Sequence, residues 1–524
     1  MRDRRRIRRR CTLAAGSCLL LLACAGTHAG DAETAALSGV QPGEPGPAPA
    51  AAAVAPAPPP LTLSLEAAVL AALEHNANFR VERLRPAISR TDERVQRAAF
   101  DPSFSASASI GRTEQTTNSD DEAGDETSTS DSTAAEVRVD ETLPSGTAVS
   151  LAVGVDGASS RNESDSDSSG ASWEASLSQS LLQGGGTAAN LARLRQARLD
   201  TDLSLYEFRA ATETLVAQVE QGYWGCILAE RSMDIYVRSM EVALQEIQEV
   251  KERIEVGKLA ETELAAAEAE VASRREQLIE ARGTLAKRRL ELIRLLNPAG
   301  EDVWTRELRL SDPPETDVVA IEEVAAHVRT AMEQRADLNQ ARLRVAQGDL
   351  ETVRTRNGRL PKLDLFVSLG GSRYANSFSD AGDEDEDAVS YTAGLSFEMP
   401  WGNRAARARH ERAALSLEQT RAALCNMEQL VQVDVRAAHV DVERAAERMK
   451  ATKATRVLRE KTVDNEMEKF RVGRATAFMV AQAGRDRVAS EIAEVEAIID
   501  YRLALLALYR LDGSLLARKG ISVK

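Results

Sequence analysis

The chain has 524 residues, a net charge of −15, 28% charged residues and only 4% aromatic residues. So acidic a chain has no basic surface to neutralise phosphates, which excludes nucleic acid as a main partner. Its abundance of Ala, Glu, Arg and Leu favours long helices over one deep globular core.

The first 25 residues read as a bacterial export signal. The strongly basic MRDRRRIRRR precedes CTLAAGSCLLLLACA, an apolar stretch too short to span a bilayer as a helix. Leu21-Leu22-Ala23-Cys24 resembles a lipobox, in which Cys24 becomes the lipidated N-terminus, but Ala23-Cys24-Ala25 also fits an ordinary cleavage site. The Ala/Pro-rich run that follows, up to residue 60, favours an extended linker.

The rest of the chain is a tandem duplication. LEHNANFRVERLR at 73–85 matches MEQRADLNQARLR at 332–344 with an offset of 259 residues. Val256-Gly257 matches Val472-Gly473 with an offset of 216 residues. The difference between the offsets, 43 residues, is extra chain between these anchors in the first copy.

Each copy changes from a helical to a strand period near a proline. FSASASIG at 104–111 and LDLFVSLGG at 363–371 alternate apolar with mostly small or polar residues, as do SWEASLSQS at 172–180 and VSYTAGLSFEM at 389–399. Strands of about nine to eleven residues with one apolar face have the length of tilted membrane-spanning strands. Period two alone fits a half-buried strand of a soluble sandwich equally well.

The extra residues of the first copy contain a further hairpin. EVRVDETLPSGTAVSLAVGV at 136–155 predicts two strands that turn at Pro144-Ser145-Gly146. Whether this hairpin enters the barrel wall or folds over it is left open by the sequence. Because open sheet edges in lipid leave unsatisfied backbone groups, several copies must share one barrel if the strands are in a membrane.

A long helix and a shorter return helix follow the strands in each copy. Thr187 to Val256 is about 70 residues, or roughly 105 Å of helix, whereas the return from Lys258 to Asn297 is about 60 Å. The uncovered part of the long helix needs a second short helix, and the segment that opens each copy has the right length. We expect the packing seam to consist of Met233, Val237, Met240, Leu244, Ile247 and Ile254.

The predicted fold is mainly α-helical with a membrane β-barrel part, built from duplicated strand-strand-helix units, with a long coiled-coil α-barrel and a β-barrel shared by a trimer. The predicted segments are an export signal at 1–25, a linker at 26–60, helices of repeat 1 at 61–101, strands of repeat 1 with the extra hairpin at 102–183, the long helical hairpin of repeat 1 at 184–297, a connector at 298–320, helices of repeat 2 at 321–360, strands of repeat 2 at 361–401, the long helical hairpin of repeat 2 at 402–512 and a tail at 513–524.

Catalytic and metal-binding motifs are missing from the sequence. The five histidines form no HExxH spacing, and no GxSxG or Walker phrase occurs. Cys226 and Cys425 form no CxxC pair and are predicted to pack in helices. We therefore predict neither an enzyme nor a bound cofactor or metal.

The order of segments resembles the TolC family of outer-membrane efflux and secretion channels, over residues 61–516. The likeness is carried by LSLEAAVLAALEHNANFRVERLR with AAFDPSFSASASIG, by SLSQSLLQGGGTAANLARLRQAR, and by FRVGRATAFMVAQAGRDRVASEIAEVEAIIDYRLALLALYRLDG. The resemblance implies a homotrimer in the outer-membrane lipid of a Gram-negative bacterium, extending into the periplasm. It also implies a passive conduit of a tripartite efflux or type I secretion system, with a periplasmic adaptor (membrane fusion protein) and an inner-membrane pump as partners.

The resemblance also implies functions for the two Val-Gly corners. It assigns the periplasmic tip and adaptor contact to Val256, Gly257, Lys258, Leu259, Arg471, Val472, Gly473 and Arg474. It assigns the pore gate to Thr262, Glu263, Phe470, Met479 and Gln482. The basic residues at the corners suit the dipole of a helix C-terminus equally well.

The gate departs from the family pattern at several positions. Glu263 stands for an aspartate, Phe470 for a tyrosine and Ala475 for a gating arginine. Met479 and Gln482 stand for two aspartates that ring the pore. A gate closed by tyrosine and arginine hydrogen bonds is therefore not preserved. The competing hypothesis is a periplasmic coiled-coil structural or adaptor protein without a membrane barrel.

Overall fold

The computed structural model describes residues 61–117, 126–161, 166–298, 304, 308–314, 317–375 and 387–522. These belong to one compact unit, Pro58–Lys524. The predicted export signal, Cys24 and the linker lie outside the described residues, as does part of the connector at 298–320. Among the described helices, none combines the length and the apolar character needed to cross a membrane.

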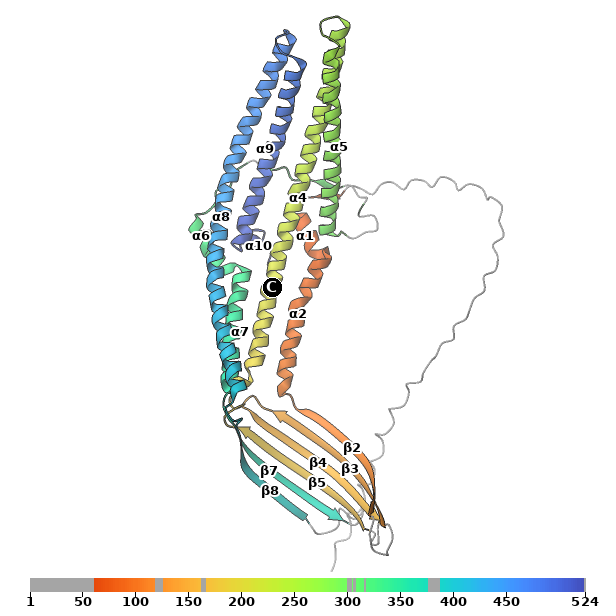
Figure 1. Cartoon of the computed structure of the whole chain (residues 1–524), viewed down its shortest axis with the longest axis vertical. Helices are drawn as coiled ribbons and strands as arrows, with labels where there is room; N and C mark the ends of the chain where they lie inside the picture. The colour runs from red at the N-terminus through yellow and green to blue at the C-terminus, as the bar shows by residue number, and fades with distance from the viewer. Residues whose placement is uncertain are drawn as a thin grey trace, which may run out of the picture. The chain divides into compact units, whose positions relative to one another are not determined.

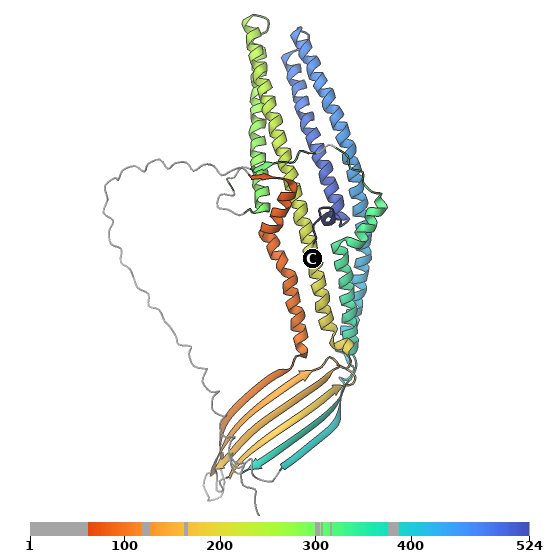
Figure 2. The ribbon, with the colours of Figure 1, turned by 180° about the vertical axis from the view of Figure 1, so that it is seen from behind.

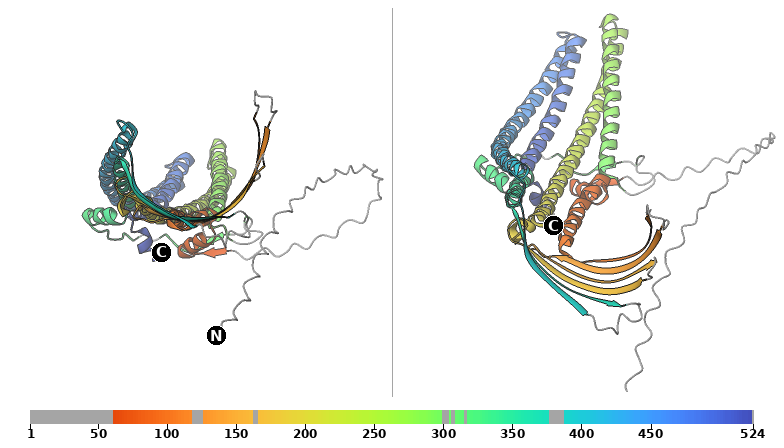
Figure 3. Two further views of the ribbon diagram at one scale, coloured as in Figure 1. Left: turned by 90° about the horizontal axis from the view of Figure 1, so that it is seen from below. Right: turned by 60° about the horizontal axis from the view of Figure 1, so that its bottom comes forward.

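The long described strands of both repeats join in one antiparallel sheet of six (Figure 1). Its order is β2 (Ser103–Thr117), β3 (Glu126–Thr142), β4 (Thr147–Arg161), β5 (Ser166–Ser180), β7 (Lys362–Ala375) and β8 (Asp387–Glu398). The extra hairpin is β3 and β4, and it lies within the sheet between β2 and β5. Figure 3 shows that the sheet is curved.

The strands are longer than the sequence pattern predicts. They run for 12 to 17 residues instead of about nine to eleven. The additional residues are largely Ser and Thr, whose pairing continues beyond the apolar band because β-structure needs no apolar face to complete its hydrogen-bond ladder. These longer strands extend past the apolar band at the ends that lie away from the helices.

The register gives the sheet one continuous apolar face. Phe104 pairs with Val139, Val139 with Leu151, and Leu177 with Val367. Pairs directly opposite each other point to the same face. Ile110 and Tyr391 on this face are 88% and 85% exposed, so the described part of the chain provides no layer that covers them.

The helices leave the sheet on one side, and their order repeats the order of the duplication (Figures 1 and 2). Repeat 1 contains α1 (Leu65–His75), α2 (Ala77–Arg97), η1 (Ala98–Phe100), α3 (Thr187–Asn190), α4 (Ala192–Glu255) and α5 (Thr262–Leu296); repeat 2 contains α6 (Val324–Gln334), α7 (Ala336–Asn357), α8 (Arg404–Arg471) and α9 (Ala477–Leu511), with α10 (Leu515–Arg518) in the tail.

The short helices stack on the return helices, as the helix lengths predict. The Asn76 side chain donates from Nδ2 to the Leu295 carbonyl (2.8 Å), and the Asn297 side chain donates to the His75 carbonyl (2.9 Å). Gly513 occupies the matching corner of repeat 2, where an added Cβ would lie 3.1 Å from the Arg335 nitrogen. Both corners adopt a positive φ, 43° at Asn297 and 73° at Gly513, because α5 and α9 each end in a left-handed residue.

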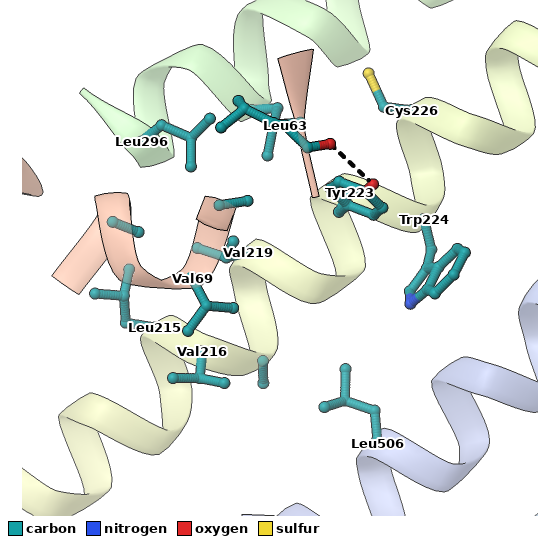
Figure 4. Close-up of a cluster of buried hydrophobic side chains, with 14 of the residues drawn as sticks. Leu63, Val69, Leu215, Val216, Val219, Tyr223, Trp224, Cys226, Leu296 and Leu506 are labelled. Atoms are coloured by element: carbon teal, nitrogen blue, oxygen red, sulfur yellow. Dashed lines mark hydrogen bonds between the residues drawn. The ribbon is translucent and has the colours of Figure 1, made fainter. Parts of the chain in front are cut away.

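Two short strands were missed by the helix and connector predictions. Leu61–Leu63 forms β1 and pairs in parallel with β6 (Leu308–Leu310). The Tyr223 hydroxyl donates to the Leu63 carbonyl (3.2 Å), as Figure 4 shows. Burial raises the pKa of Tyr223 to about 12, so this hydroxyl remains a donor at neutral pH. Helix α1 begins only at Leu65, because its start is set by the Ser64 cap.

The packing seam predicted for the long helix is also wrong in position. Its members are half-buried, and Leu244 is exposed, whereas the buried line runs through Ile235, Ser239, Ala243 and Val250. Helix α4 contacts both α5 and α9, so small residues occupy the line between its two partners. A heptad pattern describes contact with a single partner and misses this second one.

The two cysteines of the helices differ in environment. Cys226 is buried in a cluster with Val219, Trp224 and Leu506, and burial raises its thiol pKa to about 11 (Figure 4). Cys425 is exposed on α8, which corrects the prediction that both cysteines pack between helices.

Candidate functional site at the helical tips

The two Val-Gly corners have the same backbone hydrogen bonds. At the first, Gly257 donates to the Ile254 carbonyl (2.9 Å) and Lys258 to the Arg253 carbonyl (2.8 Å). At the second, Gly473 donates to the Phe470 carbonyl (3.1 Å), and the next residue donates to that of Lys469 (2.7 Å). This pair of bonds closes a helix in a Schellman motif, which needs a left-handed residue after the cap.

The glycines serve this motif by their conformation alone. Gly257 has φ +70° and Gly473 has φ +72°, and nothing lies within 4 Å of a Cβ added at either one. The cost of another residue would therefore be backbone strain and not a clash.

The tips present apolar and basic side chains to solvent. Val256 and Val472 are 65% and 69% exposed. Lys258 and Arg474 are exposed beside them, and Leu259 is half-buried. Arg471 forms an ion pair with Glu468 (2.7 Å), which offsets its charge.

The structure separates the predicted gate residues into two groups. Thr262 begins α5 and is exposed, and Glu263 next to it is half-buried. Met479 and Gln482 are exposed on α9. Phe470 is only 8% exposed, because it packs between the hairpins. Of these residues, Phe470 alone is buried in contact with the other hairpin.

Arg253 holds Phe470 from the first hairpin. Its guanidinium carbon lies 4.7 Å from the centroid of the Phe470 ring, a cation–π contact between α4 and the end of α8. Arg253 also pairs with Glu249 on its own helix (3.1 Å).

A buried ion pair joins the two helical hairpins close to Phe470, on its side away from the tips. Glu270 on α5 accepts from Arg485 on α9 at 2.5 Å and pairs with Arg274 at 2.8 Å. Arg274 and Glu270 are both buried. Burial raises the pKa of Glu246 on α4, and the nearby Glu270 carboxylate raises it further. The ion pair thus joins the two hairpins, and Glu246 is a second buried carboxylate beside it, whose raised pKa is only partly offset by Arg274 and Arg487.

A cavity lies between the hairpins at the same level. It has a volume of about 60 Å³ and is lined by Ala243, Glu246, Glu270, Phe470, Phe478 and Arg485, among others. Thr262, Glu263, Met479 and Gln482 are not among the residues that line it. In the described ranges, no three His, Cys, Asp or Glu side chains gather to hold a metal ion.

Sequence reasoning missed Arg253, Glu246, Glu270 and Arg485. In a chain with 28% charged residues, a buried charge has no local signature. Glu270 and Arg485 are 215 residues apart, so only tertiary packing brings them together. The 3.6-residue period does place Glu246, Val250 and Arg253 on one helix face, which was the available signal.

The soluble sandwich of the competing hypothesis does not fit the fold. The six strands of the described sheet form a single layer, and the other described sheet has only β1 and β6. A sandwich needs a second sheet against the apolar face.

Known structures share this fold. CusC, studied for transmembrane channel formation, has 15% identity and a TM-score of 0.66, covering 86% of this chain and 92% of its own. The Campylobacter jejuni outer membrane channel CmeC has 15% identity and a TM-score of 0.64, covering 86% of each chain. The Neisseria gonorrhoeae outer membrane channel MtrE has 18% identity and a TM-score of 0.60, covering 86% of this chain and 89% of its own.

The comparison with protein families is decisive. A search of curated protein sequences finds no match to the chain. The family model described as outer membrane efflux protein matches residues 69–298 and 328–514. The predicted family, location and fold class are confirmed, and the family is one of channels and not of enzymes. Because the match covers most of its residues, the chain belongs to the outer membrane efflux protein family and is an efflux channel that spans the outer membrane and extends into the periplasm.

Proposed function

We propose that three copies of this chain form one passive conduit, which receives cargo from an inner-membrane pump through a periplasmic adaptor. The observation that carries the trimer is the open sheet. Each outer strand, β2 or β8, has one strand neighbour in the described structure, so each has one unpaired edge. Edges of this kind cost several kcal/mol per unsatisfied group in lipid.

The unpaired edges of β2 and β8 have the right directions to pair with each other. Every neighbouring pair in the six-stranded order is antiparallel, so β2 and β8 run in opposite directions. Strand β8 of one copy can therefore extend its ladder onto β2 of the next copy. A contact between two different edges repeats around an axis and closes into a ring.

The flanks of the helical layer support the same arrangement. Helix α8 lies on the β8 side and exposes Leu430, Val433 and Val440; helix α2 lies on the β2 side and exposes Val81, Leu84 and Ile88 (Figure 1). These residues follow helical spacing on each flank. In a contact between two neighbouring copies, the exposed apolar residues of α8 in one copy and of α2 in the other would cover each other.

The tips are the proposed contact with the adaptor. Val256 and Val472 supply apolar contact area, and Lys258 and Arg474 supply charge around it. Leu259, Gly257, Gly473 and Arg471 complete the two corners. The cargo of the conduit would be chosen by the pump.

The gate residues are proposed to act through the contact between the hairpins. Phe470 under Arg253, and Glu270 with Arg485, keep the second hairpin against the first. Thr262, Glu263, Met479 and Gln482 are proposed to face the pore. Opening would separate the two hairpins and break both contacts.

Disulfide cross-linking of the edge strands tests the trimer. In a Cys425→Ser background, Thr392→Cys on β8 is combined in turn with Ser105→Cys, Ser107→Cys or Ser109→Cys on β2. Membranes are oxidised, and the products are separated by size. We expect trimers from at least one double variant and only monomers from each single variant, because the contact joins different edges. A soluble protein that stays monomeric in every variant overturns the proposal.

A further inference from the structure

We propose that the hairpin of β3 and β4 sets the width of the conduit, by expanding the barrel to 18 strands that admit cargo of macromolecular width. This inference rests on the trimer proposed above. It combines the six described strands of each copy with the match between their span and that of the helical layer.

In the described part of the second repeat, β7 pairs directly with β8 and the hairpin has no counterpart. Strand β7 matches β2 by the offset that places Gly111 on Gly370, and β8 matches β5 as the strand that leads into the long helix. The pair β7–β8 shows the unit that the duplication requires. Strands β3 and β4 are therefore an addition of two strands to one repeat.

The hairpin is a fixed part of the wall. It pairs without a slip along β2 and β5, and its outward residues Val153 and Leu151 continue the apolar face. Its turn is fastened to α3, which leads into the long helix: the Asn190 side chain donates to the Pro144 carbonyl (3.1 Å), and the Gly186 amide before α3 donates to that of Ser145 (3.1 Å). A Cβ at Gly146 would lie 2.2 Å from the Gly184 oxygen, so this turn is closely packed.

The addition matches the sheet to the helices above it. A strand spacing of about 4.8 Å at a tilt of about 40° covers about 6 Å of circumference, so six strands cover about 38 Å and four about 25 Å. In the described structure, α2, α4, α7 and α8 lie side by side next to the sheet. Four helices at 8–10 Å cover about 32–40 Å. Six strands thus span the helical layer without an unusually steep tilt.

The lumen that follows is wide. At the same tilt, 18 strands give about 36 Å between opposite backbones, and 12 strands give about 24 Å. The polar face carries small residues such as Ser107, Gly154, Ser176 and Ser368, together with the longer Glu136, Arg138 and Glu174. The larger Phe366 lies over Gly394, where an added Cβ would be 2.6 Å from its ring, so it lies along the wall. Side chains of about 5 Å on each wall leave about 25 Å, which exceeds the width of a drug-like molecule.

Excision of the hairpin tests this width. Deletion of residues 126–161 joins the outer ends of β2 and β5 and keeps their apolar faces aligned. Both proteins are imaged as particles in nanodiscs and sized in planar bilayers with neutral polyethylene glycols added on the external side. We expect 18 wall strands and a polymer cut-off near 25 Å for the full chain, against 12 strands and about 14 Å after deletion.

The outcomes are distinguishable. A trimer of the full chain with 12 wall strands, or an unchanged polymer cut-off after deletion, overturns the inference and leaves the proposed function intact. An assembly that is not trimeric overturns the proposed function. If the deletion variant does not fold, the strand count of the full chain decides the question.

Discussion

His327 Nδ1 lies 2.7 Å from Asp512 Oδ2, and both side chains are buried where α6 meets the end of α9. The two repeat offsets place this pair on Ala68 and Leu296, which are buried in the apolar cluster of repeat 1. One repeat therefore closes its corner with a polar pair, and the other closes the same corner with hydrophobic contact.

This difference predicts a strong coupling between the two residues. His327→Ala or Asp512→Leu alone leaves a buried partner uncompensated and should cost about 3–5 kcal/mol. The double variant reproduces the apolar corner of repeat 1 and should recover most of the loss. Apparent melting temperatures of the detergent-solubilised protein, followed by circular dichroism, give the comparison. Additive losses in the double variant would show that the pair is not coupled.

Replacing a tip glycine should destabilise the tip through backbone strain and not through a steric clash. Gly473→Val should destabilise the tip by about 1–2 kcal/mol, because a β-branched residue resists positive φ. Gly473→Asn should cost less, since Asn tolerates this conformation. Hydrogen exchange of the tip amides measures the loss, and drug tolerance measures export.

Gly283→Val on α5 is the matched control for the tip. Gly283 also has open space around its Cβ position, but its φ is not positive. This variant should therefore leave the tip amides and export unchanged. Equal damage at positions 283 and 473 would contradict a role for the left-handed conformation.

We expect the two helical hairpins to pack more tightly in acid, where the buried Glu246 carboxyl group is neutral. Its pKa is raised in the folded protein by burial and then by Glu270, so the folded state binds this proton more strongly than the unfolded state. At pH values above the folded-state pKa, the ionised Glu246 carboxylate lowers the free energy of unfolding by its full amount. This loss disappears at pH values below the ordinary glutamate pKa of 4.5. Glu246→Gln should raise the melting temperature at neutral pH and have little effect near pH 4.

Glu249→Gln controls for the loss of one charge on the same helix. Glu249 is more exposed and already paired with Arg253. Its replacement should not raise the melting temperature at neutral pH. A pH profile of Glu246→Gln parallel to that of the unmodified protein would refute the assignment.

We expect loss of the Arg253 side chain to let ions leak through the gate. Arg253→Ala removes the cation–π contact with Phe470, which is worth about 0.5–2 kcal/mol. The weakened contact should increase the time that the purified channel spends open in planar bilayers. Lys251→Ala, which removes an exposed charge from the same turn, should not change the opening. Equal conductance of both variants would argue against a role for Phe470 in closure.

Cys24 predicts a lipid anchor. If it is the modified residue, the mature N-terminus carries acyl chains and a correspondingly larger mass, and Cys24→Ala loses them. Mass spectrometry of the purified protein decides between this outcome and cleavage at an ordinary site. An unmodified N-terminus would exclude lipidation.

Local chemistry determined much of this protein from its sequence alone. The Val256-Gly257 and Val472-Gly473 corners form Schellman motifs whose hydrogen bonds span six residues. Each corner is therefore determined by residues that are close together in the sequence. The alternation of FSASASIG and LDLFVSLGG likewise assigns each side chain to a face, because the strand period is two. The repeat offsets then predicted the order of elements.

Only tertiary structure decided the contacts between distant segments. The sequence predicted the hairpin of β3 and β4, but its insertion between β2 and β5 depends on hydrogen bonds to other strands. The contacts of Arg253 with Phe470 and of Glu270 with Arg485 depend on how two separate hairpins approach each other. The backbone period records which face of a helix is apolar, but it holds no information about the partner that covers that face.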